Sequence, residues 1–273
     1  MFILLAYILG ILVGMILGLI GGGGVFLFPI NHFLLGQDVA SASAHAACLV
    51  CIAATMGAIP RIRRGEVDWP TVFALGIPVS AGMLLVRLWL LSVIPEVLCT
   101  IGDYDVTRKT VVLVPFAMLL VLSFASMKGL IAKDLKPRLK MRTENPTRYY
   151  SILIVVGLLI GIVPGFAGAG GGVLIVPILV VLFGLPMKTV VGTSLTIVAA
   201  KSAIGFLGGD LVSIPDKIDF QFLAQFSVVM VAGSLIGSKL AHRIDGQRLK
   251  NAFAWLVLAL AIYIFVKETI FVA

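Results

Sequence analysis

The chain has 273 residues, of which 60% are hydrophobic and only 12% are charged, and its net charge is +8. Its mean hydropathy of +1.13 and its uncharged runs, such as residues 2–37 and 149–187, exclude a soluble globular domain and indicate an integral membrane protein. The first run lacks a basic n-region and a small-residue cleavage site. We therefore expect a retained first helix rather than a signal peptide.

Taken in chain order, the first half begins with a predicted spanning helix at residues 2–19. In this helix Gly10, Gly14 and Gly18 recur every four residues, a spacing typical of close helix packing in membranes. After a glycine-rich break we expect a short helix and three more spans, at residues 25–35, 39–59, 70–94 and 111–127. The second half repeats this order, with its first span, short helix and three further spans at residues 149–164, 173–183, 187–208, 220–239 and 253–266.

The two glycine-rich breaks have similar sequences. Residues 20–30 read IGGGGVFLFPI and residues 168–178 read GAGGGVLIVPI, with six identical positions in register. Glycine runs are unfavourable inside helices, and the N–H groups that they free are tolerated at membrane depth only inside the protein or beside a water-lined cavity. The helix that restarts after each break points its N-terminal N–H groups at whatever occupies the break, which suits an anion. Two such breaks in corresponding positions indicate the central site of a transporter.

The segment at residues 128–148 divides the chain. It carries seven basic and two acidic residues, and a short basic loop between spans is far more often topogenic than nucleic-acid-binding. We therefore predict a first membrane repeat at residues 1–127, a basic cytoplasmic linker that contacts anionic lipid at most, and a second membrane repeat at residues 149–273.

Basic loops change sides between the two copies. The loop at residues 60–64 holds three arginines, whereas the corresponding loop at 210–219 holds three aspartates and one lysine. Conversely, the near-neutral loop at 95–109 corresponds to a basic one at 239–250. Because basic loops stay in the cytoplasm, the repeats are predicted to be inverted, with both termini outside it. The predicted fold is an all-α integral membrane protein with eight full helices and two short or re-entrant ones.

The paired glycine segments, together with the sequence VGTSL at residues 191–195, resemble the TauE/SafE sulfite exporter family. This resemblance covers nearly the whole chain and implies a bacterial inner-membrane carrier of sulfite, organosulfonates or related anions. The first half departs from the pattern, because His45 stands there opposite Thr193 and an alanine opposite Ser194. One hydroxyl pair is thus lost and an imidazole is gained.

The candidate substrate-binding residues lie in the breaks and on the helices that follow them. They are Gly22, Gly23, Gly24, Val25, Asn31, His45, Gly170, Gly171, Gly172, Val173, Thr193, Ser194 and Lys201.

Several of these residues also have a purely structural interpretation. His45 can bind the anion as imidazolium or carry a coupled proton, or it can be a neutral histidine bonded to a backbone carbonyl. The hydroxyls of Thr193 and Ser194 can bind the anion or the backbone of their own helix. Lys201 can serve as a counter-charge or extend to the outer surface.

Other classes of function are less well supported by the sequence. No nucleophile–base pair, metal cluster or nucleotide motif is visible, so we expect neither an enzyme nor a bound cofactor or metal, and we prefer a secondary transporter to a self-powered pump. The expected partners are a small anionic substrate, a coupled proton or other ion, and membrane lipid, with no nucleic acid. The alternatives left open are an anion channel and a carrier of a different small anion, such as a carboxylate. The anion, the direction of transport, the coupling ion and the oligomeric state are left open as well.

Overall fold

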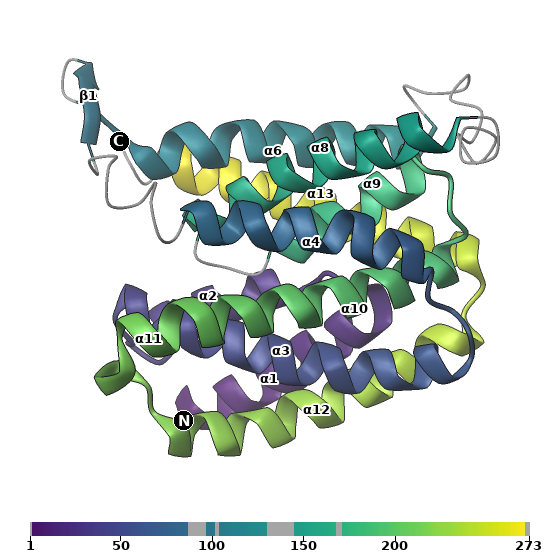
Figure 1. The fold of residues 1–273 in the computed structure, drawn as a ribbon. Coiled ribbons are helices and arrows are strands. Elements are labelled where there is room, and N and C mark those ends of the chain that lie inside the picture. Colours follow the sequence, from purple (N-terminus) through teal and green to yellow (C-terminus); the bar gives the residue numbers. More distant parts are fainter. Residues whose placement is uncertain (1, 87–96, 102–103, 130–144, 168–170, 271–273) are drawn as a thin grey trace.

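The computed structural model describes residues 2–86, 97–101, 104–129, 145–167 and 171–270 (Figure 1). The elements of the first half are α1 (Phe2–Ile20), η1 (Gly23–Phe26), α2 (Leu27–Pro29), η2 (Ile30–Leu34), α3 (Val39–Arg63), α4 (Trp69–Leu85), β1 (Val97–Ile101), β2 (Tyr104–Thr107) and α6 (Arg108–Met127). Those of the second half are α8 (Pro146–Ala167), η4 (Gly171–Leu174), α9 (Ile175–Val181), α10 (Met187–Gly205), η5 (Phe206–Asp210), α11 (Leu211–Ser213), η6 (Pro215–Lys217), α12 (Phe220–Arg243) and α13 (Gly246–Ile270).

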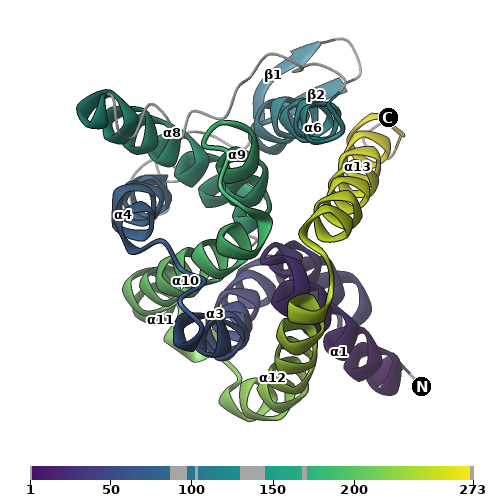
Figure 2. The same cartoon turned by 90° about the vertical axis from the view of Figure 1, so that its right-hand side faces the viewer.

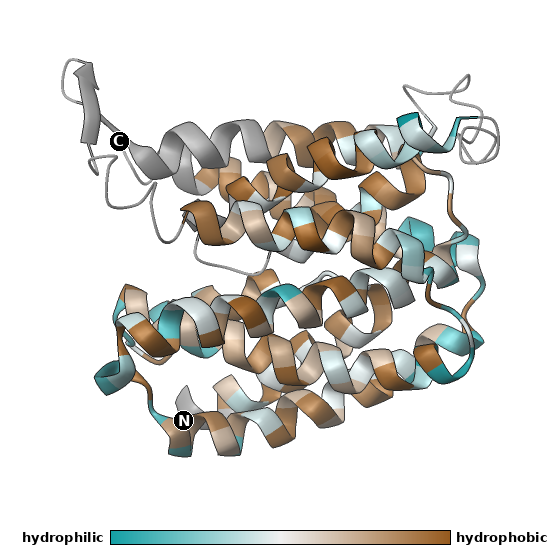
Figure 3. Cartoon of the chain, viewed as in Figure 1, coloured by the Kyte–Doolittle hydropathy of each residue, from teal (hydrophilic) through white to brown (hydrophobic). Residues whose placement is uncertain are grey.

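The described chain is helical apart from one short antiparallel hairpin, β1–β2, which lies in the segment expected to be an irregular loop. Among the described helices, four are long and apolar enough to cross a membrane: Val39–Arg63, Met187–Ser213, Phe220–Arg243 and Gly246–Val266. Most of each helix consists of apolar residues, drawn in brown in Figure 3, and polar residues gather toward the helix ends. Large side chains such as Val228 and Ile77 are more than 60% exposed, as expected on a surface that faces lipid. The chain is thus a multi-pass helical membrane protein.

The helices form two groups. In Figures 1 and 2, α4, α6, α8, α9 and α13 lie mainly on one side, and α1, α3, α10 and α12 lie on the other. Helix α1 packs against α12, α4 against α8, and α6 against α13, while α10 contacts both α3 and α4 and so joins the two groups.

Glycines allow the closest of these contacts. A Cβ atom at Gly18 of α1 would overlap the carbonyl of Ser234 on α12, and one at Gly237 of α12 would overlap the carbonyl of Met15 on α1. Small residues let helix backbones approach each other in this way, so van der Waals contact holds the pair without a bulky interface. The packing role predicted for the glycines of the first helix is confirmed at Gly14 and Gly18, both of which face the α12 backbone.

Helices α3 and α10 run antiparallel. Arg61, near the end of α3, donates a hydrogen bond to the carbonyl of Lys188 at the start of α10 (3.5 Å). Ser41, near the start of α3, donates to the carbonyl of Lys217, which follows the end of α10 and α11 (3.1 Å). The two helices therefore lie side by side in opposite directions and form the centre of the molecule (Figure 1).

Helix α3 is longer than predicted because it continues through Pro60 to Arg63. A proline inside a helix removes one backbone hydrogen bond and usually ends or bends the helix. Here the last turn is held from outside, since the buried Arg61 guanidinium reaches Glu66 beyond the helix end, in addition to the Lys188 carbonyl. The prediction that places all three arginines in a loop is therefore wrong for Arg61 and Arg63, which lie in the last turn of α3, and Arg61 is only 1% exposed.

Candidate functional site

The first glycine break is a sharp turn at the end of α1. Gly21 adopts φ +80°, a conformation that favours glycine, and its N–H donates to the carbonyl of Leu17 (2.7 Å). The chain then folds back so closely that a Cβ atom at Gly23 would lie 2.6 Å from the Leu17 nitrogen and 2.9 Å from the Val13 oxygen. Glycine is therefore required here by contact with α1, whatever else the break does.

The two breaks lie against each other. A Cβ atom at Gly22 would lie 3.4 Å from the Cα of Val173, and one at Gly172 would lie 3.5 Å from the carbonyl oxygen of Gly21. Accordingly, η1 contacts η4. Of the predicted site, Gly22–Val25 and Gly171–Val173 are brought together, and Gly170 lies outside the described residues. Two segments that are 148 positions apart thus form one structural unit.

Each break also packs on the long helix that follows it. Gly24 faces Val50 of α3, where an added Cβ would lie 2.6 Å from a valine methyl group, and Gly172 faces Val198 of α10 in the same way. The two glycines differ by 148 positions, and so do the two valines. The internal repeat of the sequence is therefore matched by repeated contacts at both breaks.

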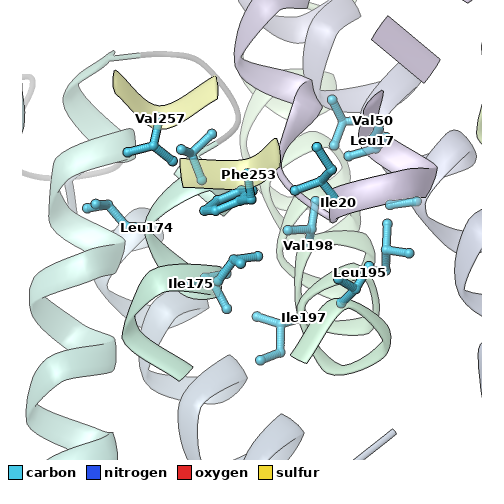
Figure 4. Close-up of a cluster of buried hydrophobic side chains, with 14 of the residues drawn as sticks. Leu17, Ile20, Val50, Leu174, Ile175, Leu195, Ile197, Val198, Phe253 and Val257 are labelled. Carbon is cyan, nitrogen blue, oxygen red and sulfur yellow. The ribbon is translucent and has the colours of Figure 1, made fainter. Parts of the chain in front are cut away.

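The surroundings of the breaks are hydrophobic (Figure 4). The side chains labelled there come from α1, α3, η4, α9, α10 and α13, and they are Leu17, Ile20, Val50, Leu174, Ile175, Leu195, Ile197, Val198, Phe253 and Val257. Among such groups an anion would have to draw its stabilisation from backbone N–H groups or from a buried cation, since hydrocarbon supplies none.

Ser194 and Thr193 make hydrogen bonds across the two halves. The Ser194 hydroxyl donates to the carbonyl of Gly21 in the first break (3.1 Å), and both atoms are buried. The Thr193 hydroxyl accepts a hydrogen bond from the backbone N–H of Asp68, the residue before α4 (3.0 Å). Neither hydrogen bond goes to the backbone of α10 itself. Both residues therefore hold the two halves together in this conformation.

His45 lies at the opposite end of the central helix pair from Thr193. Its Nε2 accepts a hydrogen bond from the backbone N–H of Asp219, the residue before α12 (2.9 Å). An imidazole nitrogen that accepts from an N–H carries no proton of its own, so Nδ1 is protonated and donates to the side-chain oxygen of Gln37 (2.8 Å). His45 is thus the neutral tautomer. Its hydrogen bonds go to Gln37 and Asp219 rather than to the glycine breaks.

Lys201 of α10 and Asn31 of η2 are buried polar residues. Lys201 is 2% exposed on α10 and follows Val198, the residue that packs on Gly172, by about one helical turn. It is enclosed by protein rather than extended to the surface. Asn31 is fully buried in the π-helical turn η2, where its amide nitrogen donates to the carbonyl of Ala42 (3.4 Å). Among the described residues its Oδ1 has no hydrogen-bond partner.

The sequence did not predict a charged cluster at the end of α3. Besides Glu66 (3.2 Å) and Lys188, the Arg61 guanidinium contacts the carbonyl of Gly18 in α1 (3.4 Å). His242, at the end of α12, lies 3.5 Å from the other carboxylate oxygen of Glu66. One buried arginine thus joins α1, α3, the α3–α4 loop and α10. The signal available in the sequence was a glutamate two residues after the arginine run.

An apolar cavity adjoins the second break on the side of α6 and α8. It has a volume of about 650 Å³ and is lined by hydrocarbon from α6, α8 and the η4–α9 segment, including Leu122, Leu159 and Ile178. Such a lining suits an apolar group, whereas an anion would lose its hydration there without gaining any hydrogen bond or opposite charge. The glycine breaks therefore remain the better candidate for a charged substrate.

The chain is similar to known membrane transporters. The family model described as "Sulfite exporter TauE/SafE" matches residues 6–264. A probable membrane transporter protein of Xylella fastidiosa (strain Temecula1) is 27% identical over 267 residues, which cover 93% of this chain and 92% of that protein. One from Haemophilus influenzae is 36% identical over 119 residues, 43% of this chain and 44% of that protein.

No solved structure matches the chain. The family match covers nearly all of the sequence and agrees with the apolar helices and paired glycine breaks described above. The chain belongs to the TauE/SafE sulfite exporter family of membrane transporters and is not an enzyme.

Proposed function

We propose that this chain is a secondary transporter that carries sulfite or an organosulfonate across the bacterial inner membrane and binds it at the two glycine breaks. The observation that carries this proposal is the contact between η1 and η4, which places both breaks in one unit inside a transporter family. Facing breaks in two halves of a transporter are a common place for substrate, because interrupted helices expose N–H groups there.

In this mechanism the backbone supplies most of the binding. Gly22–Val25 and Gly170–Val173 would direct N–H donors at the oxygens of the anion, and the absence of glycine side chains would let the anion approach the backbone. Lys201 would supply a full positive charge about one turn beyond the second break, which matters because an uncompensated charge at membrane depth costs at least ~2.5 kcal/mol. Thr193, Ser194 and His45 are engaged with protein groups, so they would contact substrate only in another conformation.

We also propose that residues 1–127 and 149–273 are inverted repeats joined by the basic cytoplasmic linker. Equivalent glycine contacts support this: Gly14 of α1 meets the Met230 backbone on α12, and Gly161 of α8 meets the Val79 backbone on α4. Exchanging the two halves converts the first contact into the second. The antiparallel course of α3 and α10, which are equivalent helices, supports inversion rather than a parallel repeat.

Binding by purified protein provides the first test. Sulfite, sulfate, thiosulfate, sulfoacetate and small carboxylates would be titrated into the wild type and into Gly22→Ala. A Cβ at Gly22 would lie 3.2 Å from the Phe253 ring and 3.4 Å from the Cα of Val173, so it fits between the two breaks after a small shift of these neighbours. We expect affinity to fall at least about tenfold, equivalent to ~1.4 kcal/mol. Gly208→Ala is the matched control, because a Cβ there has an ordinary contact with Leu84 of α4 (3.9 Å), which is not among the side chains around the breaks.

Two outcomes would change the proposal. Wild-type affinity in a folded Gly22→Ala protein would place the site elsewhere, and tight binding of carboxylates without sulfur anions would change the substrate class. Flux into proteoliposomes then separates a carrier from a channel, because carrier flux saturates with substrate and responds to a second ion gradient.

A further inference from the structure

Two equivalent hydrogen bonds tie the halves together at opposite ends of the central helix pair. In one, which we call the Asp68 latch, the backbone N–H of Asp68 donates to the hydroxyl of Thr193 (3.0 Å). In the other, the Asp219 latch, the backbone N–H of Asp219 donates to Nε2 of His45 (2.9 Å). Thr193 and His45 are 148 positions apart, like the breaks that they follow. Asp68 and Asp219 are the N-cap residues of α4 and α12, which occupy equivalent places in the two halves.

The two latches differ in one chemical respect. A threonine hydroxyl accepts a hydrogen bond over the whole physiological pH range. An imidazole nitrogen accepts only while it is unprotonated, because a protonated histidine has N–H donors on both ring nitrogens. Protonation of His45 would therefore set one N–H against another at the Asp219 latch, while the Asp68 latch would be unaffected.

The charged groups around His45 come from each element that packs against it. Asp219 precedes α12, and Asp38 precedes α3, where it forms an exposed ion pair with Lys217 of η6 (3.3 Å). His32 of η2 contacts the carbonyl of Gln37, the residue whose side chain binds Nδ1 of His45 (2.8 Å each). Burial of the ring opposes a charge on the imidazole, and the carboxylates of Asp219 and Asp38 act against that by attracting an imidazolium.

We propose that the Asp219 latch is a proton-binding site whose occupancy opens one end of the molecule. A solvent proton binds Nε2 of His45, the Asp219 N–H loses its acceptor, and the imidazolium is stabilised by the nearby carboxylates. The connection between α11 and α12 thereby loses its Asp219 bond to α3 and is left with the contacts of Lys217 to Ser41 and Asp38, while the Asp68 latch stays closed. In the transporter proposed above, on which this last point rests, the proton is the coupled ion and acts at the Asp219 end.

Hydrogen exchange of the full-length protein in lipid nanodiscs tests the latch directly, because the bond in question involves a backbone amide. Exchange would be measured between pH 5.5 and 8, above the range in which ordinary aspartates titrate (~3.9), and corrected for the intrinsic pH dependence of amide exchange. The peptide that contains Asp219 reports the latch, and the peptide that contains Asp68 is an internal control in the same molecule.

The expected size follows from histidine titration. One pH unit below the pKa of a histidine, about one imidazole in ten is neutral, so protection at Asp219 should fall about tenfold over that unit while protection at Asp68 stays constant. His45→Gln retains an acceptor near the position of Nε2 but does not titrate, so its Asp219 protection should not depend on pH. If the glutamine variant does not fold, His45→Thr replaces it. This variant places a threonine hydroxyl at the Asp219 latch, as in the Asp68 latch, so its Asp219 protection should not depend on pH either.

Protection at Asp219 that is independent of pH in the wild type would overturn the proposal, as would an equal fall in His45→Gln or His45→Thr. A fall of the same size at Asp68 would indicate general loosening and would also overturn it. These results are independent of anion binding, which is measured separately. Failure of the proposed anion site can therefore be distinguished from failure of the proton-binding latch.

Discussion

The Ser194 hydroxyl donates a hydrogen bond to the Gly21 carbonyl across 173 positions of sequence. This bond joins the helix that follows the second break to the turn that forms the first. Gly21 holds that turn with φ +80°, and the Ser194 side chain would lie 3.2–3.3 Å from a Cβ atom placed there. Each break is therefore built partly by the other half of the chain.

Ser194→Ala should destabilise the protein by about 1–3 kcal/mol, because it leaves a buried carbonyl without its partner. The measurement is thermal unfolding in detergent, followed by the loss of helical circular dichroism. Thr196→Ala, two residues further along α10, is the matched control. The Thr196 hydroxyl donates to the Gly192 carbonyl within its own helix (2.9 Å), so its loss should change stability by no more than ~0.5 kcal/mol. Equal effects of the two substitutions would show that the Gly21 contact adds nothing.

Much of the fold could be predicted from local patterns. Apolar runs and glycine spacing predicted the first helix and its packing, and residues 2–19 became Phe2–Ile20. Three features escaped because they depend on partners far along the chain: the burial of Arg61, the continuation of α3 through Pro60, and the hydrogen bonds of Thr193 and Ser194 to the other half. A basic run near a helix end resembles a solvated loop until the carbonyls of Gly18 and Lys188 are brought to it by folding.

In the candidate site, too, some features could be predicted from local sequence patterns and others depend on distant partners. The repeated glycines predicted that the breaks correspond, and the contact between η1 and η4 brings them together. His45 was singled out because it stands opposite Thr193, but the hydrogen-bond partners of these two residues, Asp219 and Asp68, became evident only from the structure. Asp68 and Asp219 are themselves equivalent, as the N-cap residues of α4 and α12, so each latch joins equivalent positions. The π-helical turns η2 and η5 were not predicted, because each has only five residues, too few to show a change of hydrophobic periodicity.

Arg61→Met should cost about 3–5 kcal/mol of stability, because it removes one partner of a buried ion pair and leaves Glu66 poorly compensated. Arg63→Met, two residues away on the exposed side of the same helix end, should change stability by no more than ~0.5 kcal/mol. Unfolding in increasing dodecyl sulfate gives both values.

A double substitution refines this prediction. Arg61→Met with Glu66→Met replaces the buried pair by apolar groups, so it should recover part of the loss. A double variant that is less stable than Arg61→Met alone would mean that Glu66 contributes chiefly through His242, which lies 3.5 Å from its carboxylate.

The orientation of the two halves is the last prediction. With the repeats inverted and basic loops in the cytoplasm, residue 63 lies inside, residue 216 outside and residue 247 inside. All three positions are exposed on connections between helices or at helix ends.

In a background with Cys48, Cys51 and Cys99 replaced by alanine, we would introduce Arg63→Cys, Asp216→Cys and Gln247→Cys one at a time. A membrane-impermeant maleimide should label only the cysteine at position 216 in intact cells, and only those at 63 and 247 in inverted vesicles. Parallel repeats would instead place positions 63 and 216 on the same side, since position 63 ends α3 and position 216 lies in η6, just before the equivalent helices α4 and α12. Labelling of those two from one side would therefore exclude inversion, and with it the idea that the Asp68 and Asp219 latches face opposite sides of the membrane.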